Sequence, residues 1–183
     1  MISDKHKCIF IHINKTGGTS ISQALGGGRG GKHASAMRLR KRFPEKFEDY
    51  FKFTFVRNPW DKLLSQYFFR VVDKGRLRAL GRSEVSFNEF VKKPFPGPHG
   101  VQLNRISDRN EKILVDFIGR FENIQDDFNV VCDRVGQKPK KLPHAFRTHH
   151  KPYWEYYDEE SMSLIAKKYK KDIELFGYKF GKL

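Results

Sequence analysis

The hydrophobic pattern of the chain alternates between short apolar runs and longer amphipathic segments. Runs rich in β-branched and aromatic residues predict strands at residues 8–13, 51–56 and 113–119. Apolar residues recur at helical spacing between and after them, at residues 19–25, from 58 onward, at 123–135 and at 158–176. Because strands alternate with helices, the pattern predicts an α/β fold of the P-loop-like, three-layer kind, with a mainly parallel central sheet flanked by helices.

Several helix boundaries are marked by residues that favour them. Asn58 is expected to cap a helix whose first turn contains Pro59, and Asp158 is expected to cap the last helix. A short helix around residues 39–43 should be interrupted by Pro44. The charged and proline-rich stretch from 73 to 110 predicts loops and short helices.

Composition indicates a folded chain with one core. At 183 residues, with 38% hydrophobic and 14% aromatic residues, the chain is expected to form a single domain over residues 1–183 and not a disordered polyelectrolyte. Two cysteines, Cys8 and Cys132, are too few for a disulfide framework or a cysteine zinc site, so reduced core thiols are expected. No apolar run approaches the roughly 18 residues of a membrane span, and no secretory signal is evident. A cytoplasmic location is expected, with the Golgi lumen open if the natural chain carries an anchor before residue 1.

The chain is strongly basic. Its formal net charge is +15 and its pI is about 9.9, so its surface field should attract anions. Nucleic acid, an acidic polysaccharide, an anionic membrane and a phosphorylated cofactor all fit this field. Charge therefore sets only the class of partner.

The loop after the first predicted strand has the composition of a phosphate-binding loop. Its glycines let backbone N–H groups approach an anion, while hydroxyls and a lysine add donors and positive charge. The residues concerned are Lys15, Thr16, Gly17, Gly18, Thr19 and Ser20. The lysine precedes the glycines, so the loop is not the usual nucleoside-triphosphate pattern. The alternative is an ordinary tight turn with an exposed lysine.

A second candidate anion site follows the second predicted strand. Arg57 stands at the strand end, and Ser65 lies about two turns into the next helix. An arginine fork with a hydroxyl suits a terminal phosphate monoester. A nucleotide triphosphatase would place a magnesium-binding Asp near this strand end, so no metal is expected. A surface arginine and an unrelated helical serine are the alternative.

These two segments carry a resemblance to a known family. Residues 10–20 and 55–65 resemble the 5′-phosphosulfate and 3′-phosphate loops of the sulfotransferases. The likeness is greatest to carbohydrate sulfotransferases of the heparan and chondroitin type, in a compact form like those of bacteria. Residues 117–123 and 172–178 also resemble the family, whereas 77–108 have no clear counterpart.

The resemblance implies a reaction and roles for individual residues. The family transfers a sulfuryl group from 3′-phosphoadenosine 5′-phosphosulfate (PAPS) to a hydroxyl or amine, releases adenosine 3′,5′-bisphosphate (PAP), and requires no metal. Lys15 would stabilise the leaving oxygen, and Arg57 with Ser65 would bind the 3′-phosphate. His33 is the expected general base, with His99 as the second choice. A basic segment closing over the nucleotide would contain Arg147 and Lys151.

The acceptor is expected to be a carbohydrate, acidic or neutral, and nucleic acid is not expected as a partner. Two rival functions fit parts of the same pattern. The first is a polyanion-binding module without chemistry, which the net charge alone would explain. The second is a metal-dependent small-molecule kinase with a nonstandard phosphate loop.

Overall fold

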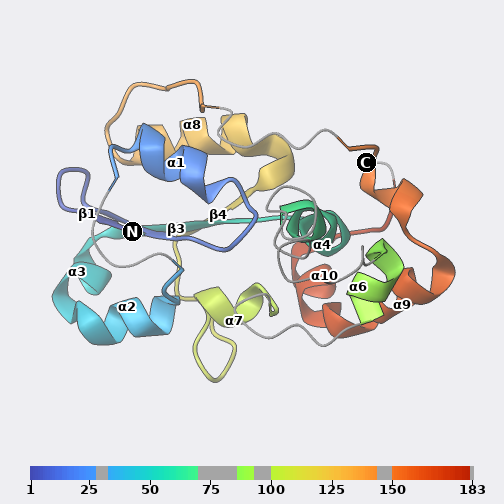
Figure 1. The fold of residues 1–183 in the computed structure, drawn as a ribbon. Helices are drawn as coiled ribbons and strands as arrows, with labels where there is room; N and C mark the ends of the chain where they lie inside the picture. Colours follow the sequence, from blue (N-terminus) through green and yellow to red (C-terminus); the bar gives the residue numbers. More distant parts are fainter. Residues whose placement is uncertain (28–32, 70–85, 93–99, 144–149, 182–183) are drawn as a thin grey trace, which may run out of the picture. The chain divides into compact units, whose positions relative to one another are not determined.

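A computed structural model describes residues 1–27, 33–69, 86–92, 100–143 and 150–181 (Figure 1). It contains two compact units. The first comprises Met1–Arg57 and Gly100–Ala145, and the second comprises Asn58–His99 and Phe146–Leu183. Each unit is described separately below, and a single domain over residues 1–183 stays a prediction. No helix within the described residues has both the length and the apolar character needed to cross a membrane.

The first unit is built on a four-stranded sheet with the order β1-β2-β3-β4. The strands β2 (Cys8–Ile11), β3 (Phe51–Val56) and β4 (Phe117–Arg120) pair in parallel. A two-residue strand, β1 (Ile2–Ser3), pairs antiparallel with β2 and was not predicted. The expected mixed α/β fold with a mainly parallel sheet is therefore confirmed.

The third predicted strand begins later than its apolar residues suggest. The apolar run starts at Ile113, but Ile113 forms only an isolated bridge with Ser107. Pairing with β3 begins at Asp116. Its N–H donates to the Lys52 carbonyl at 2.8 Å, and its carboxylate accepts a hydrogen bond from the Lys52 N–H at 2.7 Å. Ile113 and Leu114 thus bind the nearby residues Ser107 and Ile106 and not the sheet.

Helices lie on both sides of this sheet (Figure 1). One side carries α1 (Gly18–Ala24) and α8 (Ile124–Arg134), and the other carries α2 (Ala36–Arg42), α3 (Pro44–Asp49) and α7 (Leu103–Ile106). Pro44 interrupts the predicted helix as expected, but it also opens α3, because the first helical position has no need of an N–H group.

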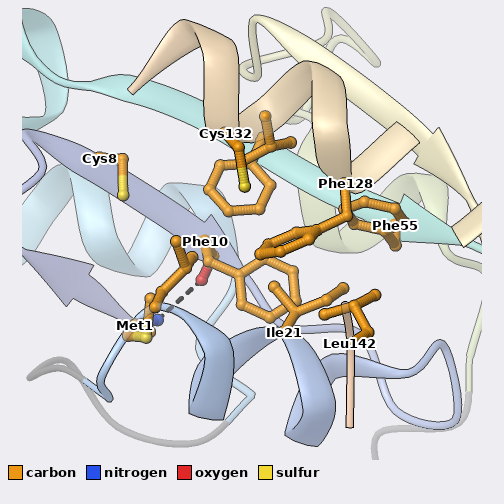
Figure 2. Close-up of a cluster of buried hydrophobic side chains, with 11 residues drawn as sticks. Met1, Cys8, Phe10, Ile21, Phe55, Phe128, Cys132 and Leu142 are labelled. Carbon is orange, nitrogen blue, oxygen red and sulfur yellow. Dashed lines mark hydrogen bonds between the residues drawn. The ribbon is translucent and has the colours of Figure 1, made fainter. Parts of the chain in front are cut away.

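The core under α1 and α8 is aromatic (Figure 2). Phe10 of β2 and Phe53 of β3 stack with ring centroids 5.0 Å apart, and Phe55 packs edge-on against both. These residues share one face because side chains two apart on a strand point the same way. Cys8 and Cys132 are both buried in this core and both free, which confirms their interpretation as core thiols. Burial raises the pKa of the Cys8 thiol to about 11.

The second unit is helical in its described part. It contains α4 (Pro59–Tyr67), α6 (Phe87–Lys92), the 3-10 turn η3 (Tyr153–Tyr156), α9 (Glu159–Lys168) and α10 (Lys170–Phe176). The predicted caps are confirmed, because Asn58 accepts from the Trp60 N–H and Asp158 forms a capping box with Ser161.

The helix predicted over residues 158–176 is divided into α9 and α10. The division falls at Tyr169, whose φ of −108° and ψ of 24° leave the helical range. Its side chain is buried, with the Lys62 ammonium 5.5 Å from the ring centroid. Burial, with a smaller contribution from Asp172, raises the pKa of Tyr169 to about 12. The apolar spacing predicted one continuous helix, whereas the chain leaves the helical conformation at Tyr169, where the ring is buried.

Candidate functional site

The Lys15 loop connects β2 to α1 and has an unusual backbone. Lys15 has φ 67° and Gly17 has φ 76°, both in the left-handed region. That region suits glycine and costs a lysine about 1 kcal/mol or more. Among the described residues, four non-glycine positions have positive φ, and Lys15 and His33 are two of them. Strain of this kind persists where the surrounding structure holds a residue in a functional position.

Thr16 stabilises the loop from inside. Its side chain is fully buried, and its hydroxyl donates to the Ile13 carbonyl at 2.9 Å. The hydroxyl hydrogen that we expected to face an anion is therefore used within the loop, and only the backbone N–H of Thr16 is left for such a role. Thr19 is exposed and Ser20 is half-buried, both in the first turn of α1.

The two glycines are required by protein contacts as well as by backbone conformation. A Cβ at Gly17 would overlap the side chain of Ile124, and a Cβ at Gly18 would overlap the ring of His12. At Gly18 the restriction comes from packing alone, because its φ is not in the left-handed region. The loop therefore lies directly on its supporting side chains, with no space for a side chain at either position.

Arg57 lies one residue beyond β3 and reaches the Lys15 loop. Its side chain is only 8% exposed, and its Nη1 donates to the Lys15 carbonyl at 3.1 Å. The guanidinium carbon lies 3.9 Å from the centroid of the Phe121 ring, which is a close cation–π contact. The structure thus brings the two predicted anion-binding segments together, although they lie 42 residues apart in sequence. Parallel neighbouring strands β2 and β3 end at the same edge, which explains this meeting.

The backbone of Arg57 is also held. Its N–H donates to Gln102 Oε1 at 3.0 Å, and its carbonyl accepts from Gln102 Nε2 at 2.9 Å. Gln102 is fully buried. No sequence signal indicated this contact, because a single glutamine in the stretch 77–108 forms no recognisable motif. Phe121 falls in a stretch that did resemble the family, but its stacking on Arg57 was not predicted.

His33 lies near the same loop, just before α2. Its Nδ1 is 3.3 Å from the His12 carbonyl, and the two histidine rings are 4.4 Å apart. A carbonyl only accepts, so Nδ1 carries the hydrogen in this contact, and Nε2 is the nitrogen with a lone pair in the neutral ring. His12 in turn packs against Gly18. His12 falls within the strand predicted over residues 8–13, but β2 ends at Ile11, and His12 connects His33 to the loop.

The remaining predicted residues belong to the second unit. Ser65 is buried on α4, so its pairing with Arg57 of the first unit stays a prediction. Lys151 is exposed and lies 3.7 Å from Glu155 in a surface ion pair. Arg147 and the alternative base His99 lie outside the described residues.

The donor set of the first unit is cationic. It consists of a lysine, an arginine, hydroxyl groups and loop N–H groups, and the segment 12–20 contains no carboxylate. Within the part of the chain that the structure describes, no group of three or more His, Cys, Asp or Glu side chains could hold a metal ion. Such a donor set suits a phosphate or sulfate group.

Comparison with known proteins gives two findings. The family model described as "Sulfotransferase family" matches residues 1–179, which is nearly the whole chain. An uncharacterized protein from Archaeoglobus fulgidus is 35% identical over 105 residues, which cover 55% of this chain and 81% of that protein. The family match includes both the Lys15 loop and Arg57.

Proposed function

Because this chain belongs to the sulfotransferase family, we propose that it transfers a sulfuryl group from PAPS to a hydroxyl group of a carbohydrate acceptor. One observation supports this proposal above the others: the guanidinium of Arg57 binds the carbonyl of Lys15 at 3.1 Å. A nucleotide with a phosphosulfate at the 5′ position and a phosphate at the 3′ position needs two cationic sites close together. The Lys15 loop and Arg57 supply these two cationic sites within the first unit.

The residues present fit such a donor. The loop offers N–H groups and a lysine, Arg57 offers a planar fork, and no acidic side chain of the loop would repel the nucleotide. PAPS supplies the activated sulfuryl group when bound. The P-loop-like, three-layer arrangement that we propose for the first unit places such ligands at the carboxyl ends of the parallel strands.

The chain's own residues then have distinct roles. Lys15 stabilises the negative charge that develops on the oxygen leaving the sulfur, as preorganised donors do. The N–H groups of the loop and the hydroxyls of Thr19 and Ser20 bind the 5′ side. We propose from the family resemblance that Arg57 binds the 3′-phosphate with Ser65, and that Arg147 and Lys151 contribute to nucleotide binding.

His33 acts as the general base in this proposal. It accepts the proton of the attacking acceptor hydroxyl at Nε2, while Nδ1 keeps its contact with the His12 carbonyl. The acceptor oxygen bonds to sulfur as the bond from sulfur to the leaving oxygen breaks. The contact with His12 fixes the ring orientation before the acceptor binds.

The net charge supports an acceptor of acidic or mixed character. With a formal charge of +15, the chain should attract an anionic glycan as well as the nucleotide. The proposal therefore favours a carbohydrate that carries carboxylate or sulfate groups over a neutral lipid or a protein side chain.

The test is transfer from isotopically labelled PAPS to a panel of neutral and acidic oligosaccharides, with the product located by mass spectrometry. The proposal expects label on an acceptor hydroxyl, stoichiometric release of PAP, and full activity with a magnesium chelator present. H33Q should retain PAP binding and lose about 10²-fold or more in kcat. Binding of PAP without transfer to any acceptor would favour a binding module, and magnesium-dependent phosphate transfer from ATP would favour a kinase.

A further inference from the structure

Gln102 occupies a place in the first unit that no sequence motif predicted. It immediately precedes α7, and it is among the largest fully buried side chains of the chain, with 0% exposure. A buried amide needs partners for both its oxygen and its NH₂ group, because an unsatisfied polar group is costly inside a protein. Its amide oxygen and its NH₂ group both bind backbone atoms of the same residue, Arg57.

The geometry resembles one step of strand pairing. Gln102 Oε1 accepts from the Arg57 N–H at 3.0 Å, and Gln102 Nε2 donates to the Arg57 carbonyl at 2.9 Å. The pairing of β3 with β4 extends to Val56 and Arg120, so Arg57 is the first residue beyond it. The Gln102 amide thus extends the hydrogen bonding of β3 by one residue. The opposite orientation of the amide would lose both hydrogen bonds.

This arrangement determines where the Arg57 guanidinium lies. Fixing the backbone N–H and carbonyl of Arg57 fixes the direction in which its side chain leaves the main chain. The side chain then has two further contacts, with the Lys15 carbonyl and with the Phe121 ring. An arginine that must bind one phosphate bidentately benefits from such preorganisation, since small displacements weaken both hydrogen bonds.

We propose that Gln102 is a positioning residue for Arg57 and that it gives the site its selectivity for a nucleotide with a 3′-phosphate. The inference rests on the proposed function, because it assigns the 3′-phosphate to Arg57. Gln102 does not contact the nucleotide in this account. Its effect reaches the ligand only through Arg57.

The experiment compares the Kd of PAP with that of adenosine 5′-monophosphate, which lacks the 3′-phosphate. Q102M keeps the length of the side chain and removes both hydrogen bonds. The ratio of the Kd of adenosine 5′-monophosphate to the Kd of PAP, which measures the preference for PAP, should fall by about fivefold or more, while the Kd of adenosine 5′-monophosphate changes by less than about twofold. If Gln102 served folding alone, its replacement would weaken the binding of both nucleotides by the same factor.

Two variants serve as matched controls. S107A removes a hydrogen bond to the Leu103 carbonyl from the other end of α7, and Q66M removes a buried amide from the second unit. Neither residue has a role in the proposed positioning of Arg57, so both proteins should keep the wild-type ratio. In an R57A background, Q102M should leave the already reduced ratio unchanged, because the side chain through which Gln102 acts is absent.

If Q102M fails to fold cooperatively, Q102N replaces it. Its shorter side chain cannot bring both amide atoms to the Arg57 backbone at once, so an intermediate ratio is expected. An unchanged ratio in a folded Gln102 variant, or an equal further loss in the R57A background, would overturn the inference and leave the proposed function intact. A wild-type protein that does not prefer PAP would instead contradict the proposed function.

Discussion

The Lys15 loop and Arg57 are held in different ways. The loop is held by residues close to it in sequence, since Thr16 binds the Ile13 carbonyl and Gly18 packs on His12. Arg57 is held by residues 42 and 45 positions away, Lys15 and Gln102. One strand, one turn and one helix start therefore determine most of the loop's conformation, and Ile124 and Arg57 add contacts from farther along the chain. The position of Arg57, in contrast, depends on the whole first unit being folded.

This difference predicts which property of the protein is lost when each segment is mutated. Changes in the loop should affect chemistry and the binding of any 5′-phosphorylated nucleotide. Changes around Arg57 should affect mainly the recognition of the 3′-phosphate.

Replacing Lys15 should abolish most of the activity without unfolding the protein. K15A should lower kcat for sulfuryl transfer by about 10²–10³-fold, as for loss of one preorganised donor in other enzymes. K15G should lose as much activity but remain at least as stable as K15A, because glycine tolerates the φ of 67° at this position. Steady-state kinetics and thermal unfolding measure the two effects.

The control for this pair is K141A, which alters an exposed lysine of the same unit. It should keep wild-type kcat and stability. Activity of K15A within about threefold of the wild type would contradict the role of Lys15 as a stabiliser of the leaving oxygen.

Adding one methyl group at Gly18 should disturb the loop through His12. The new Cβ would overlap the His12 ring, so G18A should lower the free energy of unfolding by about 1–3 kcal/mol and weaken nucleotide binding. In an H12A background the ring is absent, and the same change should cost much less. Chemical denaturation of the four proteins measures this coupling.

Gly26 provides a matched comparison for backbone strain. It has φ 77° and nothing within 4 Å of an added Cβ, so G26A should show the cost of conformation alone. Its destabilisation should be the same with or without His12. Equal effects of G18A in both backgrounds would contradict the packing that we describe.

Removing the Thr16 hydroxyl should have the smallest effect. T16V loses the hydrogen bond to Ile13 and should lower the free energy of unfolding by about 1 kcal/mol. T54V is the control, because Thr54 is equally buried and its hydroxyl donates to the Ile11 carbonyl at 2.7 Å. Both variants should be destabilised similarly, but only T16V should bind PAP more weakly. Identical PAP affinities would indicate that the Thr16 bond does not shape the loop.

The same division explains what could be predicted from the sequence. The strand, the turn and the helix start around Lys15 follow from local composition, and the caps at Asn58 and Asp158 follow from single residues. The start of β4 was predicted too early, because the apolar run does not reveal that Asp116 is the first residue to pair with β3. Likewise, nothing in the apolar spacing of residues 158–176 reveals the break at Tyr169.

The candidate site shows the same limit. Lys15 and Arg57 were identified from residue type and position, but the residues that hold them in place were not. Gln102 carries no motif, and its role depends on a contact across 45 residues. His12 was interpreted as a strand residue because a pattern of alternating positions does not show which ring packs on Gly18. Thr16 was expected to face the ligand, whereas its hydroxyl is used to close the turn.

The most direct test of the account is a titration of PAP and of adenosine 5′-monophosphate into the wild type and R57A with a magnesium chelator present. The account predicts that the wild type binds PAP more tightly by about tenfold or more, as expected for a charge-assisted bidentate contact, and that R57A loses this preference while still binding the monophosphate. Equal affinity of the wild type for the two nucleotides, or binding that requires magnesium, would contradict the claim that the Lys15 loop and Arg57 form one site for a nucleotide with a 3′-phosphate.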